Sequence, residues 1–72
     1  MKEYRPIFIT LCRATKEGAP IGQVVINPYE ILYMFRPTDK RTIIKFKNKD
    51  VIFVVESMVD IQQKINQKES NR

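Results

Sequence analysis

The chain has few of the side chains on which catalysis usually depends. It has no histidine, which excludes Ser–His and Cys–His catalytic pairs, and Cys12 is its only cysteine, which excludes an intrachain disulfide. Cys12 lies among apolar residues in a segment with strand character, where a cysteine is more often a packing residue than a nucleophile. The eight carboxylates are scattered rather than paired. We therefore expect no catalytic residues and a protein that is not an enzyme.

Metal and cofactor sites are not predicted either. A structural zinc site needs four cysteine or histidine ligands, and the chain offers one. Gly18-Ala19-Pro20-Ile21-Gly22 superficially resembles a phosphate-binding loop, but it lacks the spacing, the lysine and the following helix that hold a phosphate. We interpret this segment as a connection between strands, with closure over a ligand at a subunit boundary as the alternative.

Positive charge is concentrated in one segment. The chain carries thirteen basic and eight acidic residues, a net charge of +5. Six of the basic residues lie between Arg36 and Lys49, where Asp39 is the only acidic residue, so this segment accounts for the whole net charge. One interpretation is a patch that binds an anion such as a nucleotide, a nucleic acid or an acidic protein. The other is the solvated side of a strand, kept charged against aggregation.

Tyr29 is the aromatic residue best placed to contact a ligand, because it follows the turn-forming pair Asn27-Pro28. Stacking of a base between an aromatic ring and an arginine plane is a common way for a small β domain to hold a nucleotide. Arg13 or Arg36 would supply the arginine. The alternative is a tyrosine that closes the turn over the core.

Five further rings occupy apolar strand positions and are expected in the core: Phe8, Tyr33, Phe35, Phe46 and Phe53. The candidate ligand-binding residues are therefore the basic residues and the turn tyrosine, namely Arg13, Tyr29, Arg36, Lys40, Arg41, Lys45 and Lys47.

The elements that must position these side chains are mostly strands. Runs of β-branched and aromatic residues, separated by Gly, Pro and Asn turns, predict strands at Ile7–Arg13, Gln23–Ile26, Ile31–Phe35, Arg41–Lys47 and Val51–Val55. The last two are separated by a tight polar turn and should form an antiparallel hairpin.

After Glu56 the apolar spacing becomes helical. Ser57 and Asp60 resemble a capping box. Met58, Ile61 and Ile65 then recur at helical spacing, which predicts a helix to about Gln67, with Asp60 and Lys64 as an i,i+4 pair on its outer side. The expected fold class is α+β, mostly β: a small antiparallel sheet or partly closed barrel of about five strands, followed by one C-terminal helix.

The expected organisation is one domain over residues 1–67 and a polar disordered tail over residues 68–72. A core of this size rarely supplies more than about 3–5 kcal/mol. Strands such as Val51–Val55 are apolar on both faces, which one short helix cannot cover. We therefore expect a homo-oligomer, with a curled barrel as the alternative.

No segment predicts membrane insertion. Met1–Arg5 is not followed by the apolar stretch of a signal peptide. The longest apolar run, Val51–Val55, is far shorter than the roughly 20 residues that span a bilayer. A lone cysteine fits a reducing compartment, and we expect a cytoplasmic protein.

An ordered set of motifs runs through most of the chain: Ile9-x-Leu-x-Arg13, Ile26-Asn27-Pro28-x-x-Ile31, Thr42-x-Ile44, Val54-x-Glu56-Ser57 and Ile61-x-x-x-Ile65. With these motifs the chain resembles, over about residues 7–67, the small flagellar and swarming motility proteins of the FlbD/SwrD type. It departs from them in a longer loop at Ala14–Gly22 and in lacking an Asn-Gly turn before the last strand. The resemblance implies a motility function without enzymatic activity, and it assigns no ligand to Arg13, Asn27 or Glu56-Ser57.

Two functions follow from these observations. The first is an oligomeric module that binds a nucleotide or nucleic acid through its basic segment. The second is an adaptor that binds a protein partner, as the resemblance implies. The first predicts that nucleotides or oligonucleotides bind at low salt, and the second predicts that Lys45 and Lys47 can be neutralised with little effect on partner binding.

Overall fold

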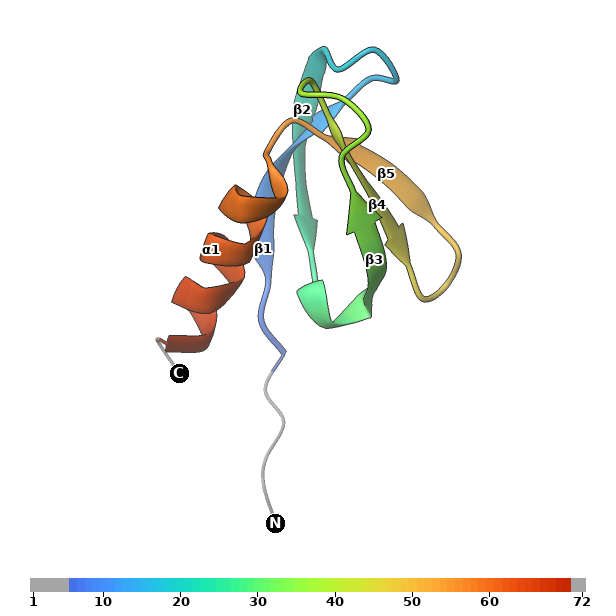
Figure 1. The fold of residues 1–72 in the computed structure, drawn as a ribbon. Coiled ribbons are helices and arrows are strands. Elements are labelled where there is room, and N and C mark those ends of the chain that lie inside the picture. Colours follow the sequence, from blue (N-terminus) through green and yellow to red (C-terminus); the bar gives the residue numbers. More distant parts are fainter. Residues whose placement is uncertain (1–5, 71–72) are drawn as a thin grey trace.

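The computed structural model describes residues 6–70 and confirms a mostly β fold with one C-terminal helix (Figure 1). Five antiparallel strands form one open sheet in the order β2-β1-β5-β4-β3. The elements are β1 (Ile9–Ala14), β2 (Pro20–Ile26), the short 3-10 helix η1 (Pro28–Glu30), β3 (Ile31–Phe35), β4 (Thr42–Phe46), β5 (Val51–Val54) and α1 (Met58–Ser70). The predictions for Met1–Arg5 and for the last two residues lie outside the described range.

The sheet consists of two units that meet at β1 and β5. The first unit is the β1–β2 hairpin, and the second is the β3–β4–β5 meander, which contains the predicted hairpin of β4 and β5. The pairing between the units is short. Arg13 lies opposite Val54, and the Val55 N–H donates to the Cys12 carbonyl at 2.9 Å. Beyond this point β5 leaves β1, and α1 runs alongside β1 instead (Figure 1).

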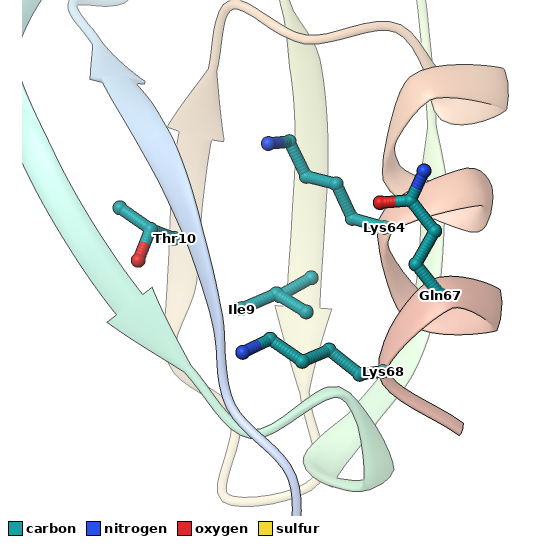
Figure 2. Close-up of a pocket in the computed structure, with 5 residues that line it drawn as sticks. All are labelled: Ile9, Thr10, Lys64, Gln67 and Lys68. Carbon is teal, nitrogen blue, oxygen red and sulfur yellow. The ribbon is translucent and has the colours of Figure 1, made fainter. Parts of the chain in front are cut away.

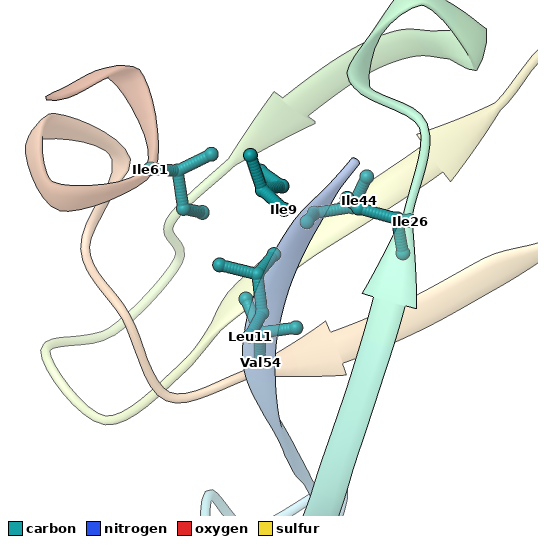
Figure 3. Close-up of a cluster of buried hydrophobic side chains, with 6 residues drawn as sticks. All are labelled: Ile9, Leu11, Ile26, Ile44, Val54 and Ile61. Atoms are coloured by element: carbon teal, nitrogen blue, oxygen red, sulfur yellow. The ribbon is translucent and has the colours of Figure 1, made fainter. Parts of the chain in front are cut away.

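The core lies between the two units of the sheet and the helix. Alternate residues of each strand face it, because successive side chains of a strand point to opposite faces. Figure 3 shows Ile61 of α1 directed toward the strand residues of the same cluster. The cluster of buried apolar side chains is Ile9, Leu11, Ile26, Ile44, Val54 and Ile61.

Side-chain hydrogen bonds define the turns that the sequence indicates. The Asn27 side chain accepts a hydrogen bond from the Tyr29 N–H at 3.0 Å, and Pro28 begins η1. The Ser57 hydroxyl accepts one from the Asp60 N–H at 3.2 Å, which confirms the predicted start of α1. The helix continues to Ser70, three residues beyond the predicted end at Gln67, so the predicted polar tail is helical as far as Ser70.

The connection between β1 and β2 is a compact hairpin loop. The Gly18 N–H donates to the Thr15 carbonyl at 2.9 Å, and the Thr15 N–H donates to the Ala19 carbonyl at 2.8 Å. Gly18 has a φ of +95° and lies against the β3–β4 turn, where an added Cβ would be 2.9 Å from the Cβ of Lys40. A side chain larger than hydrogen therefore does not fit there without movement.

Three rings predicted for the core are instead exposed, and a fourth, Phe53, is half-buried on the face opposite the buried Val54. Tyr33 is 49% exposed, Phe35 is 45% exposed and Phe8 is 53% exposed. The prediction for β3 was wrong because the register shifts between Ile31 and Tyr33, so that the strand gains an extra residue and its later side chains change face. Phe8 alternates with the buried Ile7 and Ile9 and so lies on the opposite face.

Candidate ligand-binding face of the sheet

The meander presents rings and cations on the face that points away from the core. On β4, Thr42 and Ile44 are buried, so Ile43 and Lys45 point outward. The register places Ile43 between Phe35 of β3 and Phe53 of β5, and Lys45 between Tyr33 and Val51. We call this surface the outer sheet face; its side chains are Tyr33, Phe35, Arg41, Ile43, Lys45, Val51 and Phe53.

The two rings of β3 form a platform at the edge of this face. The ring centroids of Tyr33 and Phe35 lie 6.1 Å apart with an interplanar angle of 35°. Because β3 is an edge strand, neither ring is covered by a further strand of the sheet. Lys45 lies directly opposite Tyr33, at a Cβ separation of about 4.5–5.5 Å in such a pair. A planar anion resting on the platform would therefore meet an ammonium group at its border.

Arg41 supplies a guanidinium plane on the same face. Its guanidinium carbon lies 5.4 Å from the centroid of the Phe53 ring, within the range of a cation–π contact. Its Nε atom is buried and has no hydrogen-bond partner among the described residues. Contact with the ring restrains the side chain without using its hydrogen-bond donors, and none of these donors has a partner among residues 6–70.

Arg36 is held by the protein itself. Its Nη1 donates to the Thr42 hydroxyl at 2.8 Å, the Glu56 carbonyl at 3.1 Å and the Val55 carbonyl at 3.3 Å, and its Nη2 donates to the Asp39 carbonyl. The buried Thr42 hydroxyl donates in turn to the Glu56 carbonyl at 2.6 Å. Arg36 thus joins the end of β3 to the segment that leads into α1, which is a structural use of its charge.

Glu56 is a residue whose role the sequence does not reveal. Both oxygens of its carboxylate accept the Cys12 N–H, at 3.0 and 2.9 Å. This contact takes the place of a strand hydrogen bond where β5 leaves β1. The sequence motif Val54-x-Glu56-Ser57 marks the position, but only the pairing of β1 with β5 shows which N–H the carboxylate meets.

Tyr29 lies far from the arginines considered as its stacking partners. Its hydroxyl donates to the Glu69 carboxylate at 2.7 Å, in the last turn of α1. Arg36 contacts Glu56, just before the first turn of that helix, so the two lie at opposite ends of an element about 20 Å long. Arg13 pairs with Val54, which in turn pairs with Thr42, the residue that Arg36 contacts. Arg13 therefore lies at the same end of the sheet as Arg36 and is also distant from Tyr29.

The remaining candidate residues flank β4. Lys40 is exposed in the β3–β4 turn, and Lys47 is exposed in the β4–β5 turn at the other end of the strand. Lys47 continues the outward alternation of Lys45, and its N–H is fixed by the Glu30 carbonyl at 2.8 Å. Of the seven candidates, the structure therefore brings Arg41, Lys45 and Lys47 to one side of one strand.

No group of three or more histidine, cysteine, aspartate or glutamate side chains is arranged to hold a metal ion among residues 6–70. No helix in the described part of the chain has the length and apolar character needed to span a membrane.

Comparison of the chain with models of protein families, with characterised proteins and with solved structures gave no match in any of the three.

Proposed function

We propose that this protein is a non-enzymatic, oligomeric binding module that holds a nucleotide or nucleic acid on the outer sheet face. One observation carries the proposal: aromatic rings and cations share one face of three adjacent strands, with Lys45 beside Tyr33 and Arg41 over Phe53. An exposed apolar face alone would favour a protein partner, and exposed lysines alone would favour solubility. The combination on one sheet favours a ligand with both a planar ring and negative charge.

The two kinds of contact supply different parts of the binding free energy. Stacking of a base on a ring contributes about 1–3 kcal/mol and tolerates any base, since every base has a π face. Neutralisation of phosphates by Arg41, Lys45 and Lys47 adds a term that falls with salt. Lys40 lies at the border of this set. Arg13, Arg36 and Tyr29 belong to other parts of the molecule and have no direct part in this site.

Association of several copies is the second element of the proposal. Among the described residues nine large apolar side chains are exposed, which is a large number for a domain of this size. Val25 of the edge strand β2 is 62% exposed, and Phe8 lies on the same outward side of the β1–β2 hairpin. We assign self-association to this hairpin, which leaves the meander for the ligand. The free thiol of Cys12 supports a reducing, cytoplasmic setting.

The binding proposal is tested by fluorescence anisotropy with a labelled oligothymidylate and with a fluorescent ATP analogue. In the double variant Arg41→Gln/Lys45→Gln, affinity for the oligonucleotide should fall about tenfold or more. The slope of log K against log salt should become shallower by roughly 1.4, as expected for two lost contacts to a single strand. Tyr33→Ala should weaken binding about tenfold without changing the slope.

The matched control is Lys64→Gln/Lys68→Gln, which removes the same charge from α1 and should leave the affinity of both probes unchanged. Absence of binding to either probe at low salt contradicts the proposal. An equal loss of affinity in both double variants would also contradict it, because it would show a response to net charge rather than to the outer sheet face.

A protein-interaction adaptor, as the resemblance to FlbD/SwrD-type proteins implies, is the second candidate. The open edges of β2 and β3 favour it, because unpaired strand edges accept an added strand from a partner. In this case Arg41→Gln/Lys45→Gln would leave partner capture intact. A substitution that blocks the β3 edge, such as Leu32→Pro, would abolish it.

A further inference from the structure

A second cationic site lies between β1 and α1, away from the outer sheet face. A cavity of about 290 Å³ is lined by Ile9 and Thr10 of β1 and by Lys64, Gln67 and Lys68 of α1. In Figure 2 both lysine side chains extend from the helix toward β1, and the Thr10 side chain points the other way. The volume is at the lower end of the range for small-molecule sites.

The two lysines have no counter-ion among the residues that the structure describes. They are four residues apart, so their side chains are neighbours on one face of the helix and repel each other. The predicted outer ion pair of Lys64 with Asp60 is absent, and neither lysine forms an ion pair among residues 6–70. The acidic neighbour Glu69 accepts the hydroxyl of Tyr29 instead. An anion in the cavity would relieve this repulsion.

The strand side of the cavity offers an unused donor. In an antiparallel sheet the backbone groups of alternate residues point to alternate edges of a strand. Cys12 directs its carbonyl to Val55 and its N–H to Glu56, away from β2, so Thr10 directs its N–H and carbonyl to that same edge. On the N-terminal side of Cys12, β5 no longer pairs with this edge of β1, and no described residue hydrogen-bonds to the Thr10 backbone there.

The adjacent contact on this edge shows which ligand fits. Two residues along β1, the Cys12 N–H is bound by both oxygens of the Glu56 carboxylate. We propose that the cavity between β1 and α1 binds a carboxylate, which accepts the Thr10 N–H and pairs with Lys64 and Lys68. The source is either a small free acid or an acidic side chain of a peptide, since both present the same group.

The test is an amide NMR titration of the isotope-labelled full-length chain with succinate, with acetyl-aspartyl-methylamide and with inorganic phosphate. Both carboxylates should move the Thr10 amide proton downfield, as a new charge-assisted hydrogen bond does. The Cys12 amide, already bound by Glu56, should stay in place. Lys64→Gln/Lys68→Gln should weaken binding about tenfold or more, and Arg41→Gln/Lys45→Gln should leave it unchanged.

The compounds also distinguish the source of the carboxylate. Tighter binding of succinate indicates a free acid, and tighter binding of the aspartyl compound indicates an acidic peptide. A Thr10 amide that does not move, or one that moves as far with phosphate as with succinate, overturns the proposal. Unchanged affinity for the carboxylates in Lys64→Gln/Lys68→Gln also overturns the proposal.

The helix must remain intact for these comparisons. Lys68 lies in the last turn of α1, where a cation favours the helix. The helical content of the double variant is therefore measured by circular dichroism. If it falls, Lys64→Gln alone replaces it, and retained affinity in that variant overturns the proposal. Each double variant is the control for the other. A failure of carboxylate binding in the cavity and a failure of nucleotide binding on the outer sheet face are therefore distinguished.

Discussion

At the scale of single residues, two arginines of the basic segment have different roles. Arg36 donates to four oxygens of the protein and joins β3 to the start of α1. Arg41 rests on the Phe53 ring, and its donors have no partner within residues 6–70. Both are charged residues of one basic segment, and nothing in their local sequence separates them. The difference arises from alternation on the strands and from which carbonyls lie nearby.

Substitution of Arg36 by lysine is expected to destabilise the fold without affecting the outer sheet face. A lysine has no planar fork and cannot reach four oxygens at once, so about 1–3 kcal/mol of unfolding free energy should be lost. Urea denaturation measures the loss. Lys40→Gln, an exposed change in the adjacent turn, should stay within about 0.5 kcal/mol of the original chain. A loss of oligonucleotide affinity in folded Arg36→Lys would instead place Arg36 in the ligand site.

At the scale of elements, irregularities of the sheet decide what each strand presents. The register shift after Ile31 turns Tyr33 and Phe35 outward and creates the ring platform. After Val54, β5 no longer pairs with β1, so one backbone edge of β1 is left without a neighbouring strand. The Glu56 carboxylate binds one N–H of this edge, and the cavity beside α1 lies next to it along β1. Both proposed sites therefore lie where a regular antiparallel ladder is interrupted.

The contact between the β1–β2 loop and the β3–β4 turn gives a prediction at this scale. Gly18→Ala places a Cβ 2.9 Å from the Cβ of Lys40, whereas an added Cβ at Gly22 meets no atom within 4 Å. Both glycines have a positive φ, so both substitutions strain the backbone. Thermal denaturation should show Gly18→Ala to be less stable than Gly22→Ala by about 1 kcal/mol or more. Equal effects would show that the loop does not pack on the turn in solution.

At the scale of the whole molecule, the core is small and many apolar side chains are exposed, and both features favour association of several copies. The buried cluster comprises six side chains, and a core of this size supplies only about 3–5 kcal/mol. The described residues leave apolar side chains exposed on both units of the sheet. Association through the β1–β2 hairpin would bury part of this surface and raise stability with protein concentration.

Native mass spectrometry is expected to show a homo-oligomer that Val25→Lys dissociates, because a charge on the edge strand β2 opposes apolar contact between copies. Val59→Lys is the matched control, since Val59 is 65% exposed on α1 and lies outside the proposed interface. It should leave the mass unchanged. A monomeric original chain at high concentration contradicts the oligomer proposal.

Much of the architecture was predictable from local patterns. Period-two alternation and turn residues located the strands to within a few residues, and Ser57 marked the start of the helix. The core residue Ile61 followed from the helical spacing of the apolar residues. Of the candidate site, the basic character of β4 and its turns was predictable, but the choice of partner rings was not. Tyr29 was selected for its turn, and the turn lies beside the end of α1.

The sequence by itself determined the element types, the exclusion of histidine-based catalytic pairs and of an intrachain disulfide, and the concentration of charge around β4, because these depend on residue type and spacing alone. Only the tertiary structure decided which side chains share a surface. The face that a strand residue occupies depends on its register with a partner distant in sequence, and one inserted residue reverses it. The side-chain environments of Arg36 and Tyr33 were set in this way, by neighbours that strand pairing brings together, and that of Lys64 by the packing of α1 beside β1.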